Sequence, residues 1–194
     1  MNRNTDPVVE TRYGRLRGRS VDGVHVFKGV RYAVADRFMP PRPPQPWAGI
    51  IDAFEFGAIA PQTDPSPPPG LPPVILAHLP RSAGLPPPPR ESEDCLFLNV
   101  WAPASPGRRA VMVWLHGGFF HSGSGNGVDG TRLARAHDVV VVSLNHRLNV
   151  FGFCHLEDIA GPDYAFSGNA GMLDIIAALE WVREHIELFG GDPD

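Results

Sequence analysis

A glycine-rich turn follows directly after an apolar run in the middle of the sequence. Residues 114–125 read WLHGGFFHSGSG, and the apolar run spans Val111 to Leu115. Gly117 and Gly118 can supply positive φ angles at little steric cost, so an ordinary turn is one interpretation. The other interpretation is that a ligand comes close to this bare backbone and is held by its N–H groups. The surrounding sequence has to decide between the two.

Three apolar runs of strand length surround this turn. They read CLFLNVWA, AVMVWLH and DVVVVSLN, and the last two are nearly continuous rather than alternating. Continuous runs are typical of strands buried on both faces, in a sheet that helices cover on each side. A short helix, GTRLARAH, is expected between the second and third strands. This alternation of strands and helices predicts an α/β sheet with parallel crossovers.

The last helix is predicted from the period of its apolar residues. The segment GMLDIIAALEWVREHIELFGG carries one apolar stripe, and Gly190 and Gly191 end the helix. The stripe comprises Met172, Ile175, Ile176, Leu179, Val182, Ile186 and Phe189. This stripe is expected to be the packing face of the helix, with part of the surface it packs against missing from residues 1–194, and Trp114 and Trp181 are expected to lie in the core.

The first ninety residues indicate short strands, turns and one long loop. Asp22 and Gly23 form a turn dipeptide that favours a hairpin. From Pro61 to Arg90, 12 of 30 residues are proline, so residues 61–90 are expected to be a surface loop with polyproline-like or disordered backbone. A proline-rich ligand for a signalling module is the alternative for this segment.

The composition is that of a single globular domain. The chain has 194 residues, 43% of them hydrophobic, which is enough for one core. The net charge of −4 and the lack of a basic stripe predict no nucleic acid and no membrane as partner. The polar first ten residues have no apolar stretch typical of a signal peptide, so a cytoplasmic location is expected. Cys95 and Cys154 are then expected to be free thiols.

Many segments together resemble the type-B carboxylesterase and cholinesterase family of α/β-hydrolases. EDCLFLNVWAP at 93–103 is similar to the second signature of that family. FKGVRYA, RFMPP, WLHGG, SLNHRLNVFGF, GNAGMLD, ALEWV and FGGDP also fall in the family's order. The resemblance covers Val8 to Asp194, so residues 1–194 are expected to form a single, partial α/β-hydrolase domain, its N-terminal part. It implies a mixed, mostly parallel sheet flanked by helices, with an N-terminal β-hairpin region.

This resemblance implies hydrolysis of a small-molecule carboxylic ester by a triad of serine, histidine and an acid. The serine of such enzymes lies in a G-x-S-x-G elbow, a few residues after FGGDP, and the acid and histidine come later. None of the nine serines here has that context. We therefore expect no nucleophile, acid or base in this chain and no activity of the chain alone. No cofactor is implied, and a complementary C-terminal segment is a candidate partner.

The resemblance assigns the glycine turn to the oxyanion hole. Gly118 and Phe119 would donate N–H groups to the negative oxygen of the tetrahedral intermediate, and Gly117 would support the turn. Most relatives have Gly or Ala at the position of Phe119, so its benzyl group must be accommodated beside the acyl pocket. His116 is expected to be a hydrogen-bond partner within the turn rather than an acid or a base.

Four charged residues are expected to be structural rather than catalytic. The resemblance implies two buried ion pairs, one between Arg37 and Glu93 and one between Arg147 and Asp174. Buried pairs of this kind often serve the fold alone.

The cysteines and two of the histidines are also expected to have no catalytic role. Ala60 stands where secreted relatives place the disulfide partner of Cys95, so no bridge is expected there. Cys154 is expected to pack as a small apolar residue. His121 and His155 show no metal-ligand spacing, so no zinc site is expected.

Two alternatives to an ester hydrolase stay open. One is a non-catalytic, cholinesterase-like binding protein of the adhesion kind, whose members are extracellular and disulfide-bonded. The polar first residues and Ala60 count against it. The other is a truncated product without function, or one half of a split gene whose other half supplies the elbow.

Overall fold

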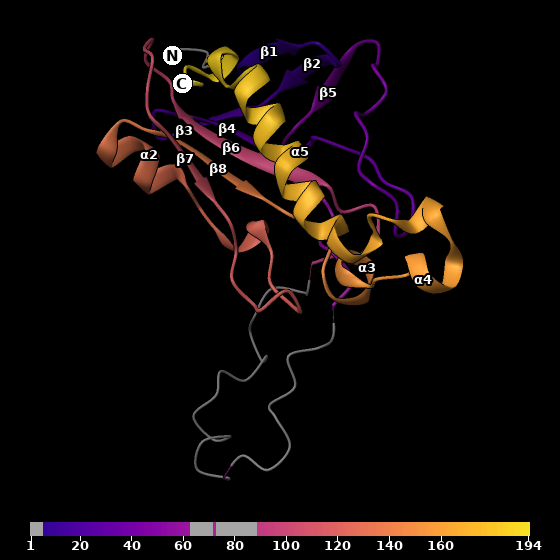
Figure 1. Cartoon of the computed structure of the whole chain (residues 1–194). Coiled ribbons are helices and arrows are strands. Elements are labelled where there is room, and N and C mark those ends of the chain that lie inside the picture. The colour runs from indigo at the N-terminus through magenta and orange to yellow at the C-terminus, as the bar shows by residue number, and fades with distance from the viewer. Residues whose placement is uncertain (1–5, 63–71, 73–88) are drawn as a thin grey trace.

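The fold was analysed in a computed structural model that describes residues 6–62, 72 and 89–194 (Figure 1). Almost all of the proline-rich segment 61–90 lies outside these described residues, so the loop expected there stays a prediction. The described residues form two sheets and a set of helices, of which the helix α5 is the longest.

The larger sheet has five strands in the order β3-β4-β6-β8-β7 (Figure 1). Its strands span Arg19–Val21 (β3), Val24–Arg31 (β4), Phe97–Pro103 (β6), Val111–Trp114 (β7) and Val140–Leu144 (β8). β3 and β4 form an antiparallel hairpin. Asp22 and Gly23 connect them with φ angles of 49° and 79°. The turn predicted at this dipeptide is therefore confirmed.

The larger sheet is mixed, as expected, but antiparallel pairs predominate among the described strands. β4 pairs with β6 and β6 pairs with β8 in antiparallel orientation, whereas β7 and β8 are parallel. The expectation of a mostly parallel sheet is therefore wrong for this part of the chain. Parallel neighbours need a long crossover connection. Among the described strands of this sheet, only β7 and β8 are joined through a helix, α2 (Thr131–His137).

A second, smaller sheet lies beside the larger one. It comprises Val8–Thr11 (β1), Gly14–Arg17 (β2) and Ile50–Asp52 (β5) in the order β1-β2-β5. β1 and β2 form the expected N-terminal hairpin, and β5 adds to β2 in parallel. Gly14 lies at this hairpin under the indole of Trp47, where a Cβ would come within 2.5 Å of the ring.

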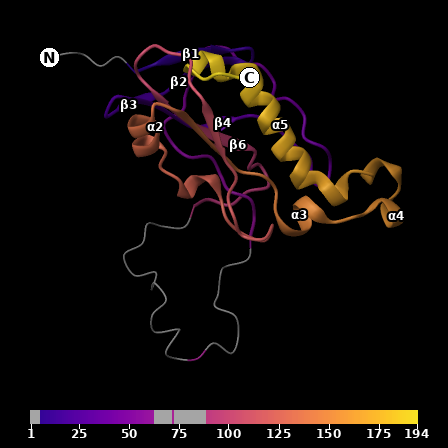
Figure 2. The ribbon, with the colours of Figure 1, turned by 60° about the vertical axis from the view of Figure 1, so that its left-hand side comes forward.

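Helices cover both faces of the larger sheet (Figure 2). α5 (Ala170–His185) packs on one face and α2 packs on the other. All five residues of β8 are buried, which confirms that this strand is covered on both faces. The short elements are Asn149–Phe153 (α3), Glu157–Ala160 (α4) and 3-10 turns at Gly125–Gly127, Pro162–Tyr164, Ser167–Asn169 and Ile186–Phe189.

β7 does not have the buried environment that its sequence predicts. Met112 and Trp114 are 37% and 46% exposed, so the expected core position of Trp114 is wrong. The cause is that β7 lies at the edge of the sheet, while α2 packs against the central strands β4, β6 and β8. Trp181 on α5 is 3% exposed, and its predicted core position is confirmed.

Part of the stripe predicted for α5 (Ala170–His185) packs on the sheet. Ile175 and Val182 of the predicted stripe are buried, together with Ala178 and Trp181. Three other members of the stripe, on the adjacent flank of the helix, are 42–50% exposed: Met172, Ile176 and Leu179. The stripe is therefore only partly covered, because the helix is apolar around more of its surface than the described strands cover.

Within the described part of the chain, no helix combines the length and the apolar character that crossing a membrane would need.

Candidate functional site

The glycine turn leaves the end of β7 through left-handed backbone. The φ angle is 122° at Gly118, 54° at Phe119 and 63° at Phe120, a region that residues with a Cβ rarely adopt. A Cβ on Gly118 would lie 2.0 Å from the carbonyl oxygen of Ser122, so only glycine fits there. Gly117 has no positive φ, and a Cβ there would meet nothing within 4 Å. The expectation that both glycines supply a positive φ is therefore right for Gly118 and wrong for Gly117.

The backbone N–H groups of this turn are available to a ligand. The carbonyl oxygen of Gly118 accepts hydrogen bonds from the N–H groups of His121 (3.0 Å) and Ser122 (3.2 Å), which closes the turn. The N–H groups of Gly118, Phe119 and Phe120 donate no hydrogen bond to any residue that the structure describes. Successive N–H groups in a turn can together bind an anionic oxygen. This backbone is compatible with the donor role predicted for Gly118 and Phe119.

The two phenylalanine side chains of the turn lie in different environments. Phe119 is 93% exposed, whereas the ring of Phe120 contacts that of Phe153 with a centroid distance of 4.9 Å. A hollow of about 460 Å³ opens beside them, lined by Phe119, Phe120, His121, Asn149, Val150, Phe153 and Cys154. Cys154 is thus half-buried at a surface hollow rather than packed in the core. The mostly apolar lining can accept an apolar group next to the free N–H groups.

Replacing Phe119 by glycine is expected to raise the free energy of unfolding by about 0.5–1 kcal/mol. A left-handed φ costs a residue with a Cβ roughly 1–2 kcal/mol, and the greater freedom of glycine in the unfolded chain offsets part of the gain. The exposed benzyl group contributes little packing that could be lost. Urea unfolding measures the change. Phe120→Gly is the control, because it relieves a similar φ but loses the contact with Phe153. An equal effect of the two substitutions would contradict this account.

Residues distant in sequence hold the turn in place. The Gln62 amide oxygen accepts from the N–H of Gly123 (2.8 Å), and the Gln62 amide nitrogen donates to the Gly123 carbonyl (3.2 Å). The N–H of Asn149 donates to the carbonyl of Phe120 (2.7 Å). Sequence reasoning missed Gln62 and Asn149, because no local pattern marks a residue whose hydrogen-bond partner lies many residues away.

A buried polar network joins the segment after the turn to the sheet. Gly125 donates its N–H to the Asn145 side-chain oxygen (2.7 Å), and its carbonyl accepts from the Ser143 hydroxyl (2.8 Å). Asn99 on β6 donates to the Ser143 hydroxyl (3.0 Å) and accepts from the N–H of Gly29 (2.9 Å). The Asn99, Ser143 and Asn145 side chains are all buried. The turn is therefore attached at both ends to rigid parts of the fold.

His116 lies at the start of the turn. Its Nδ1 is 2.9 Å from the carbonyl oxygen of Gly117, so its predicted role as a hydrogen-bond partner within the turn is confirmed. His155 faces Asp158, with Nε2 3.4 Å from a carboxylate oxygen. No group of three or more His, Cys, Asp or Glu residues that could hold a metal ion occurs among the described residues.

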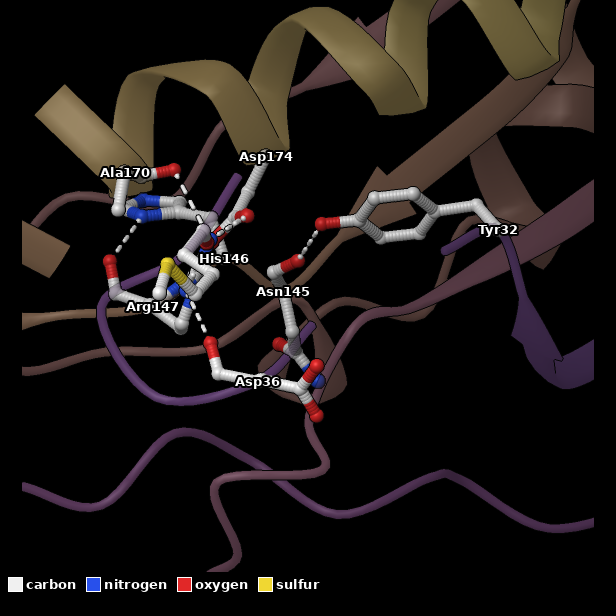
Figure 3. Close-up of polar contacts among 8 residues, drawn as sticks. Tyr32, Asp36, Asn145, His146, Arg147, Ala170 and Asp174 are labelled. Carbon is white, nitrogen blue, oxygen red and sulfur yellow. Dashed lines mark hydrogen bonds and ion pairs between the residues drawn. The ribbon is translucent and has the colours of Figure 1, made fainter. Parts of the chain in front are cut away.

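A buried ion pair ties α5 to the loop that follows β8 (Figure 3). Arg147 donates to the Asp174 carboxylate through Nε (2.8 Å), Nη2 (2.6 Å) and its backbone N–H (3.0 Å). Arg147 Nη1 also donates to the carbonyls of Met39 (2.8 Å) and Asp36 (3.3 Å). The Arg147 and Asp174 side chains are 3% and 0% exposed. The structure therefore has the buried pair that the sequence predicts here.

The second expected ion pair forms, but it is not buried. Arg37 Nε donates to Glu93 Oε2 (2.8 Å), and this bond lowers the pKa of the Glu93 carboxyl. The Arg37 and Glu93 side chains are 59% and 35% exposed. The expectation of a buried pair is therefore wrong: both residues lie in irregular segments and both side chains stay accessible to water.

Both cysteines are free, as expected. Cys95 and Ala60 are fully buried, and burial raises the pKa of the Cys95 thiol to about 12. A thiol with so high a pKa is almost entirely protonated near neutral pH and therefore a poor nucleophile.

Comparison with known proteins gives consistent matches along almost the whole chain. Residues 5–194 match the carboxylesterase family. The chain is 44% identical over 197 residues to para-nitrobenzyl esterase of Bacillus subtilis (strain 168), covering 98% of this chain and 37% of that protein. It is 37% identical over 225 residues to Neuroligin-3 of Mus musculus, covering 96% of this chain and 26% of that protein.

A solved structure shows the same arrangement of elements. A carboxylesterase of Geobacillus stearothermophilus aligns with a TM-score of 0.80 at 47% identity, covering 96% of this chain and 36% of that one. The chain therefore spans between 26% and 37% of the length of these three proteins.

Proposed function

Because this chain belongs to the carboxylesterase family, we propose that it supplies the oxyanion hole of a serine ester hydrolase. Its fold is the N-terminal part of an α/β-hydrolase fold. The observation that carries the proposal is the pair of free N–H groups at Gly118 and Phe119, on a turn whose backbone other residues hold in place. Because the turn is exposed, these N–H groups are open to a substrate oxygen as well as to water.

The reaction would be a two-step acyl transfer. A serine hydroxyl attacks the ester carbonyl carbon, and the carbonyl oxygen becomes an oxyanion that the N–H groups of Gly118 and Phe119 stabilise. Collapse of this intermediate breaks the bond to the alcohol, which leaves with a proton, and water then hydrolyses the acyl-serine. No residue in this chain is proposed as nucleophile, acid or base. No cofactor takes part in this scheme.

The substrate class is a small-molecule carboxylic ester. The apolar hollow beside Phe119 favours an apolar group on the acyl or alcohol side. The name of the Bacillus subtilis relative describes a nitrobenzyl ester, which supports nitrobenzyl esters as first test substrates.

The nucleophile would come from a complementary C-terminal segment that pairs with the free edge of β7. Gly191 already pairs in parallel with Arg109, two residues before β7 begins. Arg109 donates its N–H to Gly190 (3.0 Å) and accepts from the N–H of Asp192 (2.7 Å). A strand that continues this pairing would lie along β7 and cover an edge that exposes unpaired backbone groups and the side chain of Trp114.

Activity is expected only when such a segment is present. Residues 1–194 alone should not hydrolyse a p-nitrophenyl ester above a protein blank, and an organophosphonate should label no serine stoichiometrically. Refolding the chain together with the C-terminal portion of the Bacillus subtilis relative should give both hydrolysis and labelling. Labelling of the chain alone would overturn the proposal, and a stable complex that does not hydrolyse esters would overturn the oxyanion role.

A non-catalytic binding protein is the second candidate function. The 37% identity to Neuroligin-3, a relative whose name describes no esterase, favours it. The two free cysteines and the buried Ala60 count against the disulfide-bonded type of that group. A cytoplasmic location stays a prediction in either case. A chain that neither folds nor binds the complementary segment would instead support a truncated product without function.

A further inference from the structure

Two histidine rings stack directly behind the glycine turn. His116 precedes the turn, and His146 lies in the loop after β8. Their ring centroids are 4.7 Å apart and the ring planes differ by 4°. Nδ1 of His116 faces the carbonyl of Gly117 at 2.9 Å, and Nδ1 of His146 faces the carbonyl of Arg147 at 2.8 Å (Figure 3 shows the second contact). The stack therefore connects the turn to the loop that carries the buried ion pair.

These contacts assign the protons of both rings. A carbonyl oxygen only accepts hydrogen bonds, so Nδ1 carries the proton in each ring. A neutral imidazole then has a lone pair at Nε2. Nε2 of His116 is buried and has no hydrogen-bond partner among the described residues.

The surroundings of His146 also favour the neutral ring. The side chain is 3% exposed, and burial lowers its pKa from the usual value, with the nearby His116 adding to this effect. The charged groups close to it are Arg147 and Asp174, and they already neutralise each other in the buried ion pair. The bond to the Arg147 carbonyl and the Asp174 carboxylate act in the opposite direction, but burial has the larger effect and the pKa of His146 is lowered.

We propose that His146 is a positioning residue for the oxyanion turn, and that its neutral ring holds His116 and thereby the backbone of Gly117 to Phe119. Protonation of His146 draws the ring toward water, breaks the stack and loosens the turn. This inference rests on the proposed oxyanion role for its effect on hydrolysis, but the loosening itself is independent of that role.

The direction of the pH dependence follows from the lowered pKa of His146. The closed turn holds the neutral ring, whereas the open turn exposes a ring that titrates near its ordinary value of about 6.5. The open form therefore binds more protons, and the closed form is fully favoured above that pH. As the pH falls from about 6.5 toward the lowered pKa, the closed-to-open ratio should fall by about tenfold per pH unit.

Hydrogen exchange of the turn tests this in residues 1–194. Exchange of a peptide covering 115–123 would be followed from pH 8 to pH 5 and corrected for the intrinsic rate. The protection factor is expected to be constant above pH 7 and to fall by about tenfold per unit below 6.5. His146→Phe keeps a flat ring for the stack but cannot titrate, so its protection should not depend on pH.

His185→Phe is the matched control. His185 is also buried, stacks on Trp181 at 4.7 Å and has a pKa lowered by burial, but it lies on α5. This variant should keep the pH dependence of the turn. The proposal is overturned if His146→Phe responds to pH as the parent does, or if His185→Phe abolishes the response.

A second measurement does not depend on any variant. Nitrogen NMR of the imidazole rings should show the His146 ring protonated at Nδ1 and titrating below 6.5, and a titration at or above that value would overturn the proposal. In the enzyme formed from this chain and the complementary C-terminal segment, His146→Phe should shift the acidic side of the plot of kcat against pH. If the complemented enzyme has no activity but the turn still loosens with acid, the proposed function fails and the positioning role stands.

Discussion

Replacing Asp174 by alanine is expected to lower the free energy of unfolding by about 3–5 kcal/mol, the cost of leaving a buried charge without its partner. Arg147 would keep its charge at 3% exposure and lose three hydrogen bonds. A domain has only about 5–15 kcal/mol of stability, so the variant should be close to unfolding at room temperature. Urea unfolding followed by circular dichroism measures the change.

The exposed ion pair provides the control for this prediction. Glu93→Ala also removes a carboxylate bonded to an arginine, but the Arg37 side chain is 59% exposed and keeps its hydration. The expected loss is about 0–1 kcal/mol. A double variant, Arg147→Met with Asp174→Leu, should recover part of the loss because no unpaired charge remains. Equal losses for Asp174→Ala and Glu93→Ala would contradict the role of burial.

Replacing Phe119 by proline is expected to lower kcat by about 10²–10³ in the complemented enzyme, the usual loss for one oxyanion donor. Proline has no backbone N–H, so the oxyanion keeps only the donor at Gly118. Phe119→Gly retains the N–H and accepts the φ of 54°, so its kcat should stay within a few fold of the parent. Its main effect should be on the preference for the acyl or alcohol group, because the apolar hollow loses one wall.

Proline also changes the backbone, because its φ near −65° is incompatible with the 54° at Phe119. A semisynthetic chain with phenyllactic acid at position 119 avoids this, since an ester link removes only the N–H and keeps the side chain. It should lower kcat about as much as proline does while leaving the melting temperature nearly unchanged. A kcat equal to that of the parent in this analogue would show that the turn is only structural.

Local features of the fold could be predicted from the sequence because short-range physics sets them. The Asp22–Gly23 hairpin needs only residues that adopt positive φ, and β8 and α5 follow from the apolar pattern of their own residues. The glycine turn was also recognisable, since close backbone approach requires glycine at position 118. The family resemblance then supplied the role that we propose for the turn, which no spacing of residues within it could provide.

Only the tertiary structure determined which apolar surfaces are covered. The pattern of α5 shows which residues share a flank, but Ile175 is buried and Ile176 is half exposed because the sheet lies on one side only. The exposure of Trp114 has the same origin. β8 lies between β6 and β7, so β7 is at the edge of the sheet. Periodicity reports the geometry of one element, whereas burial depends on its neighbours.

The contacts that hold the candidate site were likewise beyond the sequence alone. Gln62 lies 61 residues from Gly123, and His116 lies in a different loop from His146, so no local pattern links either pair. The family resemblance in the sequence was enough to predict that Arg147 and Asp174 form a pair. Only the tertiary structure shows that this pair is buried and that Arg37 and Glu93 lie at the surface. The physical reason is that the energy of a charge or a ring depends on how much water its neighbours exclude, and those neighbours come from distant parts of the chain.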